Sequence, residues 1–306
     1  MSTRTDTTAT GRDAETWTVL KLMKWSGEYL EGKGVGRGRL DAEHLLAHAL
    51  GVPRLQLYLQ FDRPLAPEEL ARFRPLLRRR AEREPLQYIV GRAAFRELEL
   101  KVDPRVLVPR PETEILVDEV LAWAAGTGAQ GLEALDVGTG SGAIALSLLR
   151  EGPFSLVVAT DLSADALAVA SENARAAGLE QRLDLRPGGL FEPLGEDERF
   201  DVVVSNPPYV ADSEAASLEP EVGVWEPRAA LFAGVEGLDV ILQIVAGAAD
   251  RLRPGGLLAL EVGAGHPGRV VAALEARRTY EDVRVRRDLS GRQRVVTARK
   301  ARPEHS

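Results

Sequence analysis

A strand, a glycine-rich turn and a helix follow one another without interruption in residues 132–149. The apolar run 132–137 predicts a short buried strand, and 143–149 predicts a helix. Glycines at positions 138, 140 and 142 let the backbone turn tightly and approach a ligand without Cβ atoms in the way. This unit predicts an α/β fold with an open, mostly parallel sheet, in which a cofactor lies over the turn at the carboxyl ends of the strands.

The turn alone leaves the identity of the cofactor open. Gly138, Gly140 and Ala143 also satisfy the dinucleotide-binding pattern G-x-G-x-x-G/A, which is a weak signal by itself. Asp161 ends the next apolar strand, 21 residues after Gly140, where an acid accepts hydrogen bonds from ribose hydroxyls of either NAD or S-adenosylmethionine. Alternatively, Asp161 or Ser163 caps the helix that follows. We favour ribose binding, because the glycine turn lies one strand–helix unit earlier.

The tetrapeptide Asn206-Pro207-Pro208-Tyr209 directly follows the apolar run 201–205. Pro207 and Pro208 have no N–H, so their backbone offers only carbonyl acceptors, and Asn206 adds a side-chain carbonyl. Two convergent acceptors beside an aromatic ring would hold a planar group that carries an NH₂. The alternative is an ordinary turn, because Asn-Pro is common at the end of a strand. Such a pocket has no role in hydride transfer and suits an amino group that receives a methyl group.

Several segments together carry a family resemblance. They are 136–142, 206–209, Val108-Pro-Arg-Pro-Glu-Thr-Glu114, Asp288-Leu-Ser-Gly-Arg-Gln-Arg-Val-Val296, Pro85-Leu-Gln-Tyr-Ile89 and Glu226-Pro-Arg-Ala-Ala-Leu231. From Asp41 to Val296 the chain resembles the HemK/PrmC family, which are protein-(glutamine-N5) methyltransferases that modify the Gly-Gly-Gln loop of peptide chain release factors. Asn-Pro-Pro-Tyr is shared with nucleic-acid amino-methyltransferases, whereas Pro-Arg-Pro-Glu-Thr-Glu is specific to this family.

The resemblance implies a fold, a cofactor and a set of site residues. The fold is that of class I S-adenosylmethionine-dependent methyltransferases, a Rossmann-like, mostly parallel seven-stranded sheet with a terminal antiparallel hairpin, plus a small amino-terminal helical domain. The implied contacts to S-adenosylmethionine are Gly138, Thr139, Gly140, Ser141, Gly142, Asp161, Leu190, Asn206, Glu112 and Thr113. Asn206, Pro207, Pro208 and Tyr209 would bind the substrate, with Asn206, Pro207 and Tyr209 in catalytic roles.

One position departs from the family pattern. Members often have an acidic residue just before Leu-Phe after the third strand, where this chain has Gly189 followed by Leu190 and Phe191. Because Gly189 has no side chain to accept a hydrogen bond from an adenine amino group, a backbone group or water would have to replace it.

Composition is consistent with a cytoplasmic enzyme. The chain has 306 residues and no cysteine, which excludes disulfides, thiolate zinc sites and cysteine nucleophiles. No apolar stretch reaches membrane-spanning length, and the polar amino terminus lacks a signal-peptide core. His44 and His48 have i, i+4 spacing but lack the glutamate of a zinc-protease motif, so no metal is expected. We expect a monomer.

Charge is distributed unevenly between the expected domains. Residues 1–90 carry 15 basic and 12 acidic side chains, whereas the remainder carries 24 and 34. We expect a helical substrate-recognition domain in 1–90, with its first dozen residues disordered, a β-hairpin linker in 91–110 and the methyltransferase domain in 111–300. The arginines of the helix expected at 67–84 form either a solvated face or a partner-binding surface. Because the overall charge is −7, no stable complex with nucleic acid is expected.

Other elements are predicted from local patterns. Asp41 is a candidate cap and Gly51 a stop for the first domain's helix. Residues 95–102 alternate polar and apolar and predict one strand of a hairpin that turns at Asp103-Pro104 into 106–108. Helices are expected from 113 to 125, at 164–176 and at 237–252. A turn at 254–256, strands at 257–262, 283–286 and 295–298, and a final hairpin around Ser290-Gly291 complete the sheet.

The reaction expected from these features is direct transfer of a sulfonium methyl group to a glutamine side-chain nitrogen. Asn206 and the Pro207 carbonyl would accept hydrogen bonds from the two N–H groups of the amide, while Tyr209 packs against the plane of the amide. One alternative is a nucleic-acid amino-methyltransferase that acts on adenine N6 or guanine N2 and stacks a flipped base on Tyr209. The other is a non-enzymatic cofactor-binding module.

Overall fold

The computed structural model describes residues 16–288 and 290–302, and the chain divides into two compact units, 1–90 and 91–306. The disorder expected for the first dozen residues falls outside the described residues. Among those described, no helix is long and apolar enough to cross a membrane.

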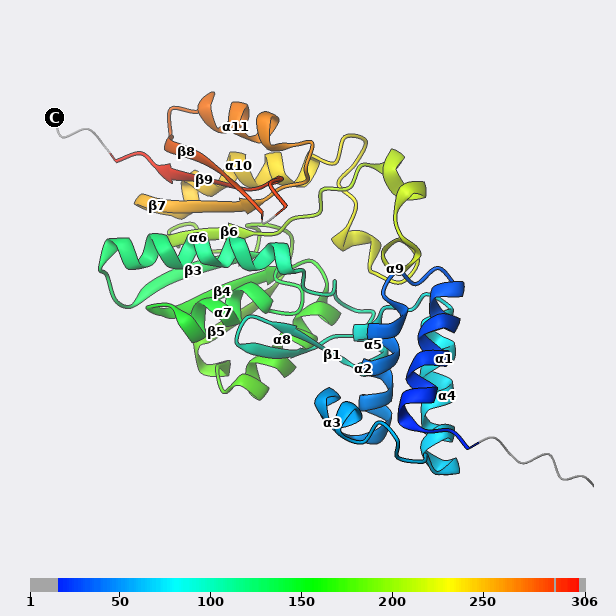
Figure 1. Ribbon diagram of the computed structural model, residues 1–306. Coiled ribbons are helices and arrows are strands. Elements are labelled where there is room, and N and C mark those ends of the chain that lie inside the picture. The colour runs from blue at the N-terminus through cyan, green and yellow to red at the C-terminus, as the bar shows by residue number, and fades with distance from the viewer. Residues whose placement is uncertain (1–15, 289, 303–306) are drawn as a thin grey trace, which may run out of the picture. The chain divides into compact units, whose positions relative to one another are not determined.

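The amino-terminal unit is helical (Figure 1). Its helices are α1 (Val19–Gly32), α2 (Gly38–Leu50), α3 (Arg54–Leu59), α4 (Pro67–Ala81) and α5 (Leu86–Val90). Leu45, Leu46 and Phe73 are buried in its core. Helices α1 and α2 approach each other closely at Gly27 and Gly38. A Cβ atom on Gly38 would lie only 2.6 Å from the carbonyl oxygen of Gly27, so this approach requires glycine. Larger side chains at these positions would force the two helices apart.

Two expectations for this unit were wrong in detail. Arg37, not Asp41, is the N-cap of α2, and Asp41 lies buried in the first turn of that helix. The Asp41 carboxylate accepts a hydrogen bond from Nε of Arg80 at 2.7 Å, so it ties α2 to α4. Helix α4 ends at Ala81, three residues early, because Arg83 adopts a φ of +67° and Glu84 precedes Pro85. Gly51 does end α2, with φ at +67°.

A seven-stranded sheet forms the centre of the second unit, in the order β5-β4-β3-β6-β7-β9-β8. The strands are β3 (Leu132–Val137), β4 (Phe154–Asp161), β5 (Leu183–Pro187), β6 (Phe200–Ser205), β7 (Leu252–Glu261), β8 (Tyr280–Arg287) and β9 (Gln293–Lys300). Strand β9 is antiparallel to both of its neighbours, whereas β3 to β7 pair in parallel. The predicted fold class is confirmed, including the antiparallel hairpin at the edge.

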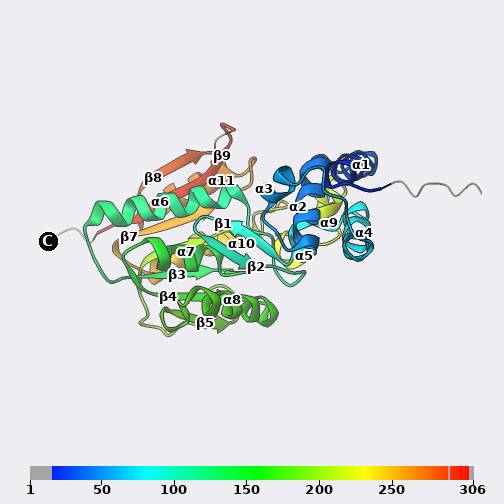
Figure 2. The ribbon, with the colours of Figure 1, turned by 60° about the horizontal axis from the view of Figure 1, so that its bottom comes forward.

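Helices cover both faces of the sheet (Figures 1 and 2). On one face, α6 (Pro111–Thr127), α7 (Ala143–Glu151) and α8 (Ala164–Ala177) pack on Ala134, Val157 and Val202. On the other, α10 (Asp239–Arg251) and α11 (Pro267–Glu275) pack on Val203 and Leu258. Neighbouring residues of each strand thus enter opposite cores, as a pleated strand buried on both sides requires.

Short elements connect the sheet. They are η1 (Glu180–Arg182), η2 (Asp212–Ser217), α9 (Pro220–Gly223) and η3 (Arg228–Ala230). The last three lie between β6 and α10, at the carboxyl end of the sheet's central strands. Val210 pairs with Phe232 in an isolated bridge that closes this connection back onto itself.

The linker hairpin differs from the prediction. Strands β1 (Arg92–Phe95) and β2 (Leu98–Lys101) pair antiparallel and turn at Arg96, which has φ at +51°, rather than at Asp103-Pro104. Residues 106–108 form no strand. The expected turn at 254–256 was also wrong: β7 begins at Leu252 and accommodates these residues in an irregular register opposite β6.

Candidate active site

The glycine turn after β3 adopts a backbone that favours glycine at three positions. Gly138, Gly140 and Gly142 have φ of +75°, +56° and +82°. The N–H groups of Gly138 and Thr139 donate to the carbonyl of Thr160 at 2.8 and 3.1 Å, which fixes the turn against the end of β4. A Cβ atom on Gly138 or Gly140 would meet nothing within 4 Å, so the space above both residues is open. A flat or elongated ligand therefore fits against the bare backbone of this turn.

Asp136 and Ser141 hold the turn from below. The Thr139 hydroxyl donates to Asp136 Oδ2 at 2.7 Å, and the Ser141 carbonyl accepts from Nδ2 of Asn173 at 2.9 Å. Asp136 is completely buried, and burial raises the pKa of its carboxyl group to about 7.

Asp161 lies at the end of β4, beside the turn. Its Oδ2 accepts from the N–H of Gly140 at 2.9 Å and its Oδ1 from the N–H of Ser163 at 2.8 Å. The helix cap is Ser163, whose hydroxyl accepts from the N–H of Ala166. Each Asp161 oxygen has a second lone pair that remains available to a ligand hydroxyl.

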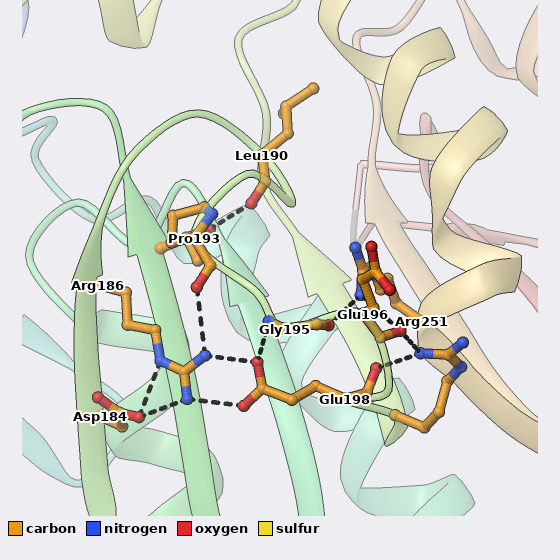
Figure 3. A network of polar contacts seen from close by, with 10 residues as sticks. Asp184, Arg186, Leu190, Pro193, Gly195, Glu196, Glu198 and Arg251 are labelled. Atoms are coloured by element: carbon orange, nitrogen blue, oxygen red, sulfur yellow. Dashed lines mark hydrogen bonds and ion pairs between the residues drawn. The ribbon is translucent and has the colours of Figure 1, made fainter.

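The segment after β5 closes the opposite side of this region. Gly188 N–H donates to the Asp161 carbonyl at 3.0 Å, and the Leu190 carbonyl accepts from the Thr160 hydroxyl at 2.9 Å. Leu190 has φ at +47°, a conformation unusual for leucine. Figure 3 shows how the loop is held: the Arg186 guanidinium lies between Asp184 and Glu198, with distances of 2.7 to 2.9 Å.

An acidic side chain returns to the position of Gly189. Glu192 Oε2 accepts from the Gly189 N–H at 3.2 Å, and it lies 3.4 Å from where a Cβ atom of Gly189 would be. A carboxylate from three residues further along therefore lies beside Gly189, and we expect it to take the place of the missing acidic side chain. Glu192 was not among the predicted site residues, because only the turn of the backbone brings it back to Gly189.

Asn206 to Tyr209 follow β6 at the same edge of the sheet. The Ser205 hydroxyl anchors the strand end by donating to the Val137 carbonyl at 2.6 Å. Burial raises the pKa of the Tyr209 hydroxyl, and the nearby Glu261 carboxylate raises it further. A Cβ atom on Gly263 would lie 3.0 Å from Cδ2 of Tyr209, so the loop after β7 touches the ring.

The start of α6 reaches Asn206 directly. Nδ2 of Asn206 donates to the Thr113 hydroxyl oxygen at 3.0 Å, and the Thr113 hydroxyl donates to Glu261 Oε2 at 2.7 Å. Thr113 and Glu261 are 4% and 1% exposed. Glu261 was not among the predicted site residues, although an acid that ends the apolar strand Leu257-Leu-Ala-Leu-Glu261 was a visible signal. Glu112, next to Thr113, is half-buried and makes no hydrogen bond with the described residues.

A second buried acid ties the segment before α6 to the connection after β6. Glu226, 4% exposed, accepts from the N–H of Val108 at 3.2 Å and from the Arg110 guanidinium. This clamp places the first turn of α6 beside Asn206. The predicted residues thus come together at the carboxyl edge of strands β3 to β7. Among the described residues no group of three or more acidic, histidine or cysteine side chains is arranged to hold a metal ion.

The donor set and the open turn fit S-adenosylmethionine. The bare glycine backbone leaves room for it, and Asp161 offers acceptors for ribose hydroxyls.

Comparison with known proteins extends this picture. Residues 21–91 match the family model of the PrmC N-terminal domain, and residues 113–220 match the methyltransferase small domain. A release factor glutamine methyltransferase of Geobacter sulfurreducens is 46% identical over 285 residues, which cover 93% of this chain and 98% of that protein. One of Rhodopirellula baltica is 39% identical over 287 residues, or 93% and 97% of the two chains.

Solved structures with this fold are more distant. A Thermus thermophilus 16S rRNA N2 G1207 methyltransferase, solved with AdoMet and guanosine, has a TM-score of 0.52 at 24% identity and covers 68% of this chain and 49% of its own. A methyltransferase of Pyrococcus furiosus has a TM-score of 0.50 at 20% identity, with coverage of 67% and 90%. These similarities support the fold alone.

Proposed function

Because this chain belongs to the family of release factor glutamine methyltransferases, we propose that it transfers the methyl group of S-adenosylmethionine to the glutamine side-chain nitrogen in the Gly-Gly-Gln loop of a release factor, and that Asn206 holds this amide.

The assignment of Asn206 to the substrate amide rests on two hydrogen-bond acceptors at the end of β6. Asn206 Oδ1 and the Pro207 carbonyl oxygen accept no hydrogen bond from the described residues. Both belong to the turn that follows β6, the strand next to the glycine turn of β3. A primary amide has two N–H groups to donate, so it matches this pair of acceptors.

These residues answer the chemical difficulty of the reaction. An amide nitrogen is a poor nucleophile, because its lone pair is delocalised into the carbonyl. Hydrogen bonds from its two N–H groups to Asn206 and to the Pro207 carbonyl would raise the electron density on the nitrogen. They would also stabilise the positive charge that develops there. Tyr209 would pack against the amide plane and limit its rotation.

S-Adenosylmethionine, when bound, supplies the methyl group as an electrophile. On the protein side, the glycine turn and Asp161 position the reactant, and Asn206 orients the nitrogen that attacks. As the new C–N bond forms, the methyl–sulfur bond breaks, and the amide nitrogen then loses one proton to solvent. The proposal assigns no protein base to this proton.

Labelled cofactor tests the assignment directly. The protein is incubated with full-length release factor, with the same factor carrying Gln→Ala in its Gly-Gly-Gln loop, and with total RNA. We expect label only in the first sample. Label in RNA would instead support the amino-methyltransferase of nucleic acids, and label in the Gln→Ala factor would refute the glutamine assignment.

We further propose that residues 1–90 select the substrate and 111–300 perform the chemistry. A groove of about 400 Å³ on the amino-terminal unit supports this. Trp25 is 47% exposed there and stacks on Tyr29, with ring centroids 5.4 Å apart and an interplanar angle of 3°. Arg74 and Arg78 also line the groove and have no ion-pair partner among the described residues. Exposed aromatic rings beside unpaired arginines suit an acidic surface of the release factor with an apolar side chain at its centre.

Full-length variants test the groove. We expect Trp25→Ala and the double variant Arg74→Glu/Arg78→Glu to raise KM for intact release factor about tenfold, while activity on a short Gly-Gly-Gln peptide changes little, because the peptide lacks the remote contacts. Arg72→Glu, at an exposed position of α4 outside the groove, is the control for charge reversal on this helix. Equal losses on both substrates would contradict a recognition role.

The proposal includes a cytoplasmic, monomeric enzyme. Light scattering of the purified protein checks the monomer, and a mass of two or more chains would contradict it.

A further inference from the structure

Three side chains from distant parts of the sequence form a line at the acceptor site. Asn206 follows β6, Glu261 ends β7, and Thr113 lies in the first turn of α6. Ser205 is paired with Leu260 in the parallel register, so Asn206 and Glu261 follow side by side at the ends of neighbouring strands. The Thr113 hydroxyl oxygen lies 3.0 Å from Asn206 Nδ2 and 2.7 Å from Glu261 Oε2.

The chemistry of the three groups fixes the direction of both hydrogen bonds. An ionised carboxylate only accepts, so the single hydroxyl proton of Thr113 must go to Glu261. The Thr113 oxygen is then left with lone pairs and accepts from a donor. Asn206 meets this requirement only when its NH₂ end faces Thr113, which turns its oxygen away from α6.

This orientation matters because the two ends of an asparagine amide have nearly the same shape. If the Asn206 side chain turned over, its NH₂ would face the NH₂ of a glutamine, and two donors would meet with no acceptor between them. Steric packing alone does not distinguish the two states, whereas a hydrogen bond does.

We propose that Thr113 and Glu261 are positioning residues that hold the Asn206 amide with its oxygen toward the substrate amide. This inference rests on the proposed function, and it gives Thr113 a role other than contact with the cofactor. Burial of Glu261 helps to fix the orientation of Asn206. A water molecule that donated a hydrogen bond to Glu261 or Thr113 could replace the hydroxyl or the NH₂ group, and Asn206 would then be free to turn over. A carboxylate this deeply buried is costly unless it is hydrogen-bonded.

Isosteric variants of the full-length enzyme test the proposal. Thr113→Val removes the hydroxyl, Thr113→Ser keeps it, and Glu261→Gln removes the obligatory acceptor with little change in shape. Thr297→Val, at a buried threonine of β9 with no part in the site, is the control for loss of a hydroxyl. The measurements are the single-turnover rate on release factor, the Kd for S-adenosylmethionine by calorimetry, and the melting temperature.

We expect Thr113→Val to lower the single-turnover rate by about 10- to 100-fold. This loss is smaller than, or at the lower end of, the loss of about 10²–10³ expected when a direct contact to the reacting group is removed. Thr113→Ser should stay within about threefold of the wild type, and Glu261→Gln should fall between them. The Kd for the cofactor should change by less than about threefold in every variant, since the positioning role replaces the cofactor contact that the family resemblance implied for Thr113.

A double-mutant cycle separates positioning from an independent effect. If Thr113 acts through Asn206, Thr113→Val should cost less than about twofold in an Asn206→Ala background. Losses that multiply in the double variant would overturn the proposal. So would a normal rate in Thr113→Val, or a cofactor Kd that rises in step with the lost rate.

Failure of the proposed function has a different signature. A wild-type protein that does not methylate release factor contradicts the function itself. An active wild type with a fully active Thr113→Val contradicts only the positioning role. Should Thr113→Val fail to fold, Thr113→Ser and Glu261→Gln still decide the matter, because equal full activity in both would show that the carboxylate does not orient Asn206.

Discussion

Oδ2 of Asp161 lies 2.9 Å from the backbone nitrogen of Gly140 and accepts a hydrogen bond from its N–H. The carboxylate at the end of β4 therefore stabilises the glycine turn as well as facing the region above it. The structure separates this residue from the helix cap, which is Ser163. The two roles that the sequence left open can thus be tested on two different residues.

Asp161→Ala should weaken binding of S-adenosylmethionine by roughly 2–4 kcal/mol, because two hydrogen bonds to a charged group contribute about 1.5–3 kcal/mol each and are not additive. Calorimetry measures the loss. Ser163→Ala is the matched control: it should lower stability by about 1 kcal/mol through loss of the cap and leave affinity unchanged. An Asp161→Ala protein that binds normally and melts early would assign the carboxylate to structure alone.

Asn206→Ala should keep the affinity for S-adenosylmethionine and reduce turnover by about 10²–10³, the effect of removing one preorganised polar contact to a reacting group. Single-turnover kinetics on release factor provides the measurement. An unchanged rate would remove Asn206 from the acceptor site, whatever its hydrogen bond to Thr113.

The rate should depend on the ionisation of Glu261. Burial raises the pKa of this carboxyl group to about 7, while the Thr113 hydrogen bond opposes the shift. Because only the ionised form is an obligatory acceptor, the single-turnover rate should rise by up to about tenfold from pH 6 to pH 8, as the ionised fraction goes from about one tenth to about nine tenths. The other ionisable groups that influence Glu261 or are influenced by it are Arg110, Glu112, Tyr209 and Arg294.

Glu261→Gln is the control for this pH profile and should flatten it at a lower rate. Asp136, whose pKa burial also raises to about 7, is intact in that variant. If the acidic decline of the rate persists in Glu261→Gln, the titrating group is Asp136 or lies on the substrate, and the assignment to Glu261 fails.

Stability should change with pH in the opposite sense. Between the ordinary pKa of glutamic acid and about 7, the folded protein keeps a proton on Glu261 that the unfolded chain has released. The stabilisation is therefore present at low pH and is lost as pH rises toward 7, at about 1.4 kcal/mol per pH unit. The difference in unfolding free energy between wild type and Glu261→Gln, measured in urea from pH 5 to 8, should follow this slope and become constant above pH 7.

Gly263→Ala should impair substrate binding through Tyr209. The added methyl would lie 3.0 Å from the Tyr209 ring and 3.1 Å from Nδ1 of His266, so one of them must move. We expect KM for release factor to rise by about three- to tenfold with the cofactor Kd unchanged, the effect of displacing a positioning contact. In Gly265→Ala, in the same loop, the added methyl group would have no neighbour within 4 Å, so KM should not change. Equal behaviour of the two variants would show that the Tyr209 ring position is unimportant.

Glu192→Gln should weaken cofactor binding more than Glu196→Gln, a control on the same loop. The Glu192 carboxylate lies where Gly189 lacks a side chain, and a charged acceptor for the adenine amino group contributes about 1.5–3 kcal/mol. Calorimetry with S-adenosylmethionine and with its N6-methylated analogue would reveal the contact. The proposal is wrong if Glu192→Gln binds both with wild-type affinity.

The order of strands and helices could be read from the sequence because apolar runs and glycine turns are local signals. Strand β3, helix α7 and the residues at the ends of β4 and β6 are where the pattern placed them. Hairpin β1–β2 was misplaced because an alternating run does not specify where the chain turns, and a left-handed Arg96 made the turn. Pro254 was taken for a turn residue, although it occupies an irregular part of β7 where no ladder hydrogen bond is required of it.

The connections within the site could not be read from the sequence. The hydrogen-bond partner of Asn206, Thr113, lies 93 positions away, and Thr113 in turn bonds Glu261 148 positions further along, so their closeness depends on the strand order. Asp41 showed the same limitation, because a cap is a local property and its actual partner, Arg80, lies 39 residues away. Glu192 was missed for a third reason: its carboxylate returns to Gly189 only through a turn of the backbone.

The line from Asn206 to Thr113 to Glu261 also bears on synthesis of the protein. A chain that has emerged only as far as Tyr209 already contains the glycine turn, Asp161 and the asparagine, so every residue assigned to the cofactor is present. It lacks β7, and with it the carboxylate that gives the asparagine a single orientation. The carboxylate that orients the asparagine is therefore the last part of the site to be synthesised, and this orientation is fixed only when β7 joins the sheet beside β6.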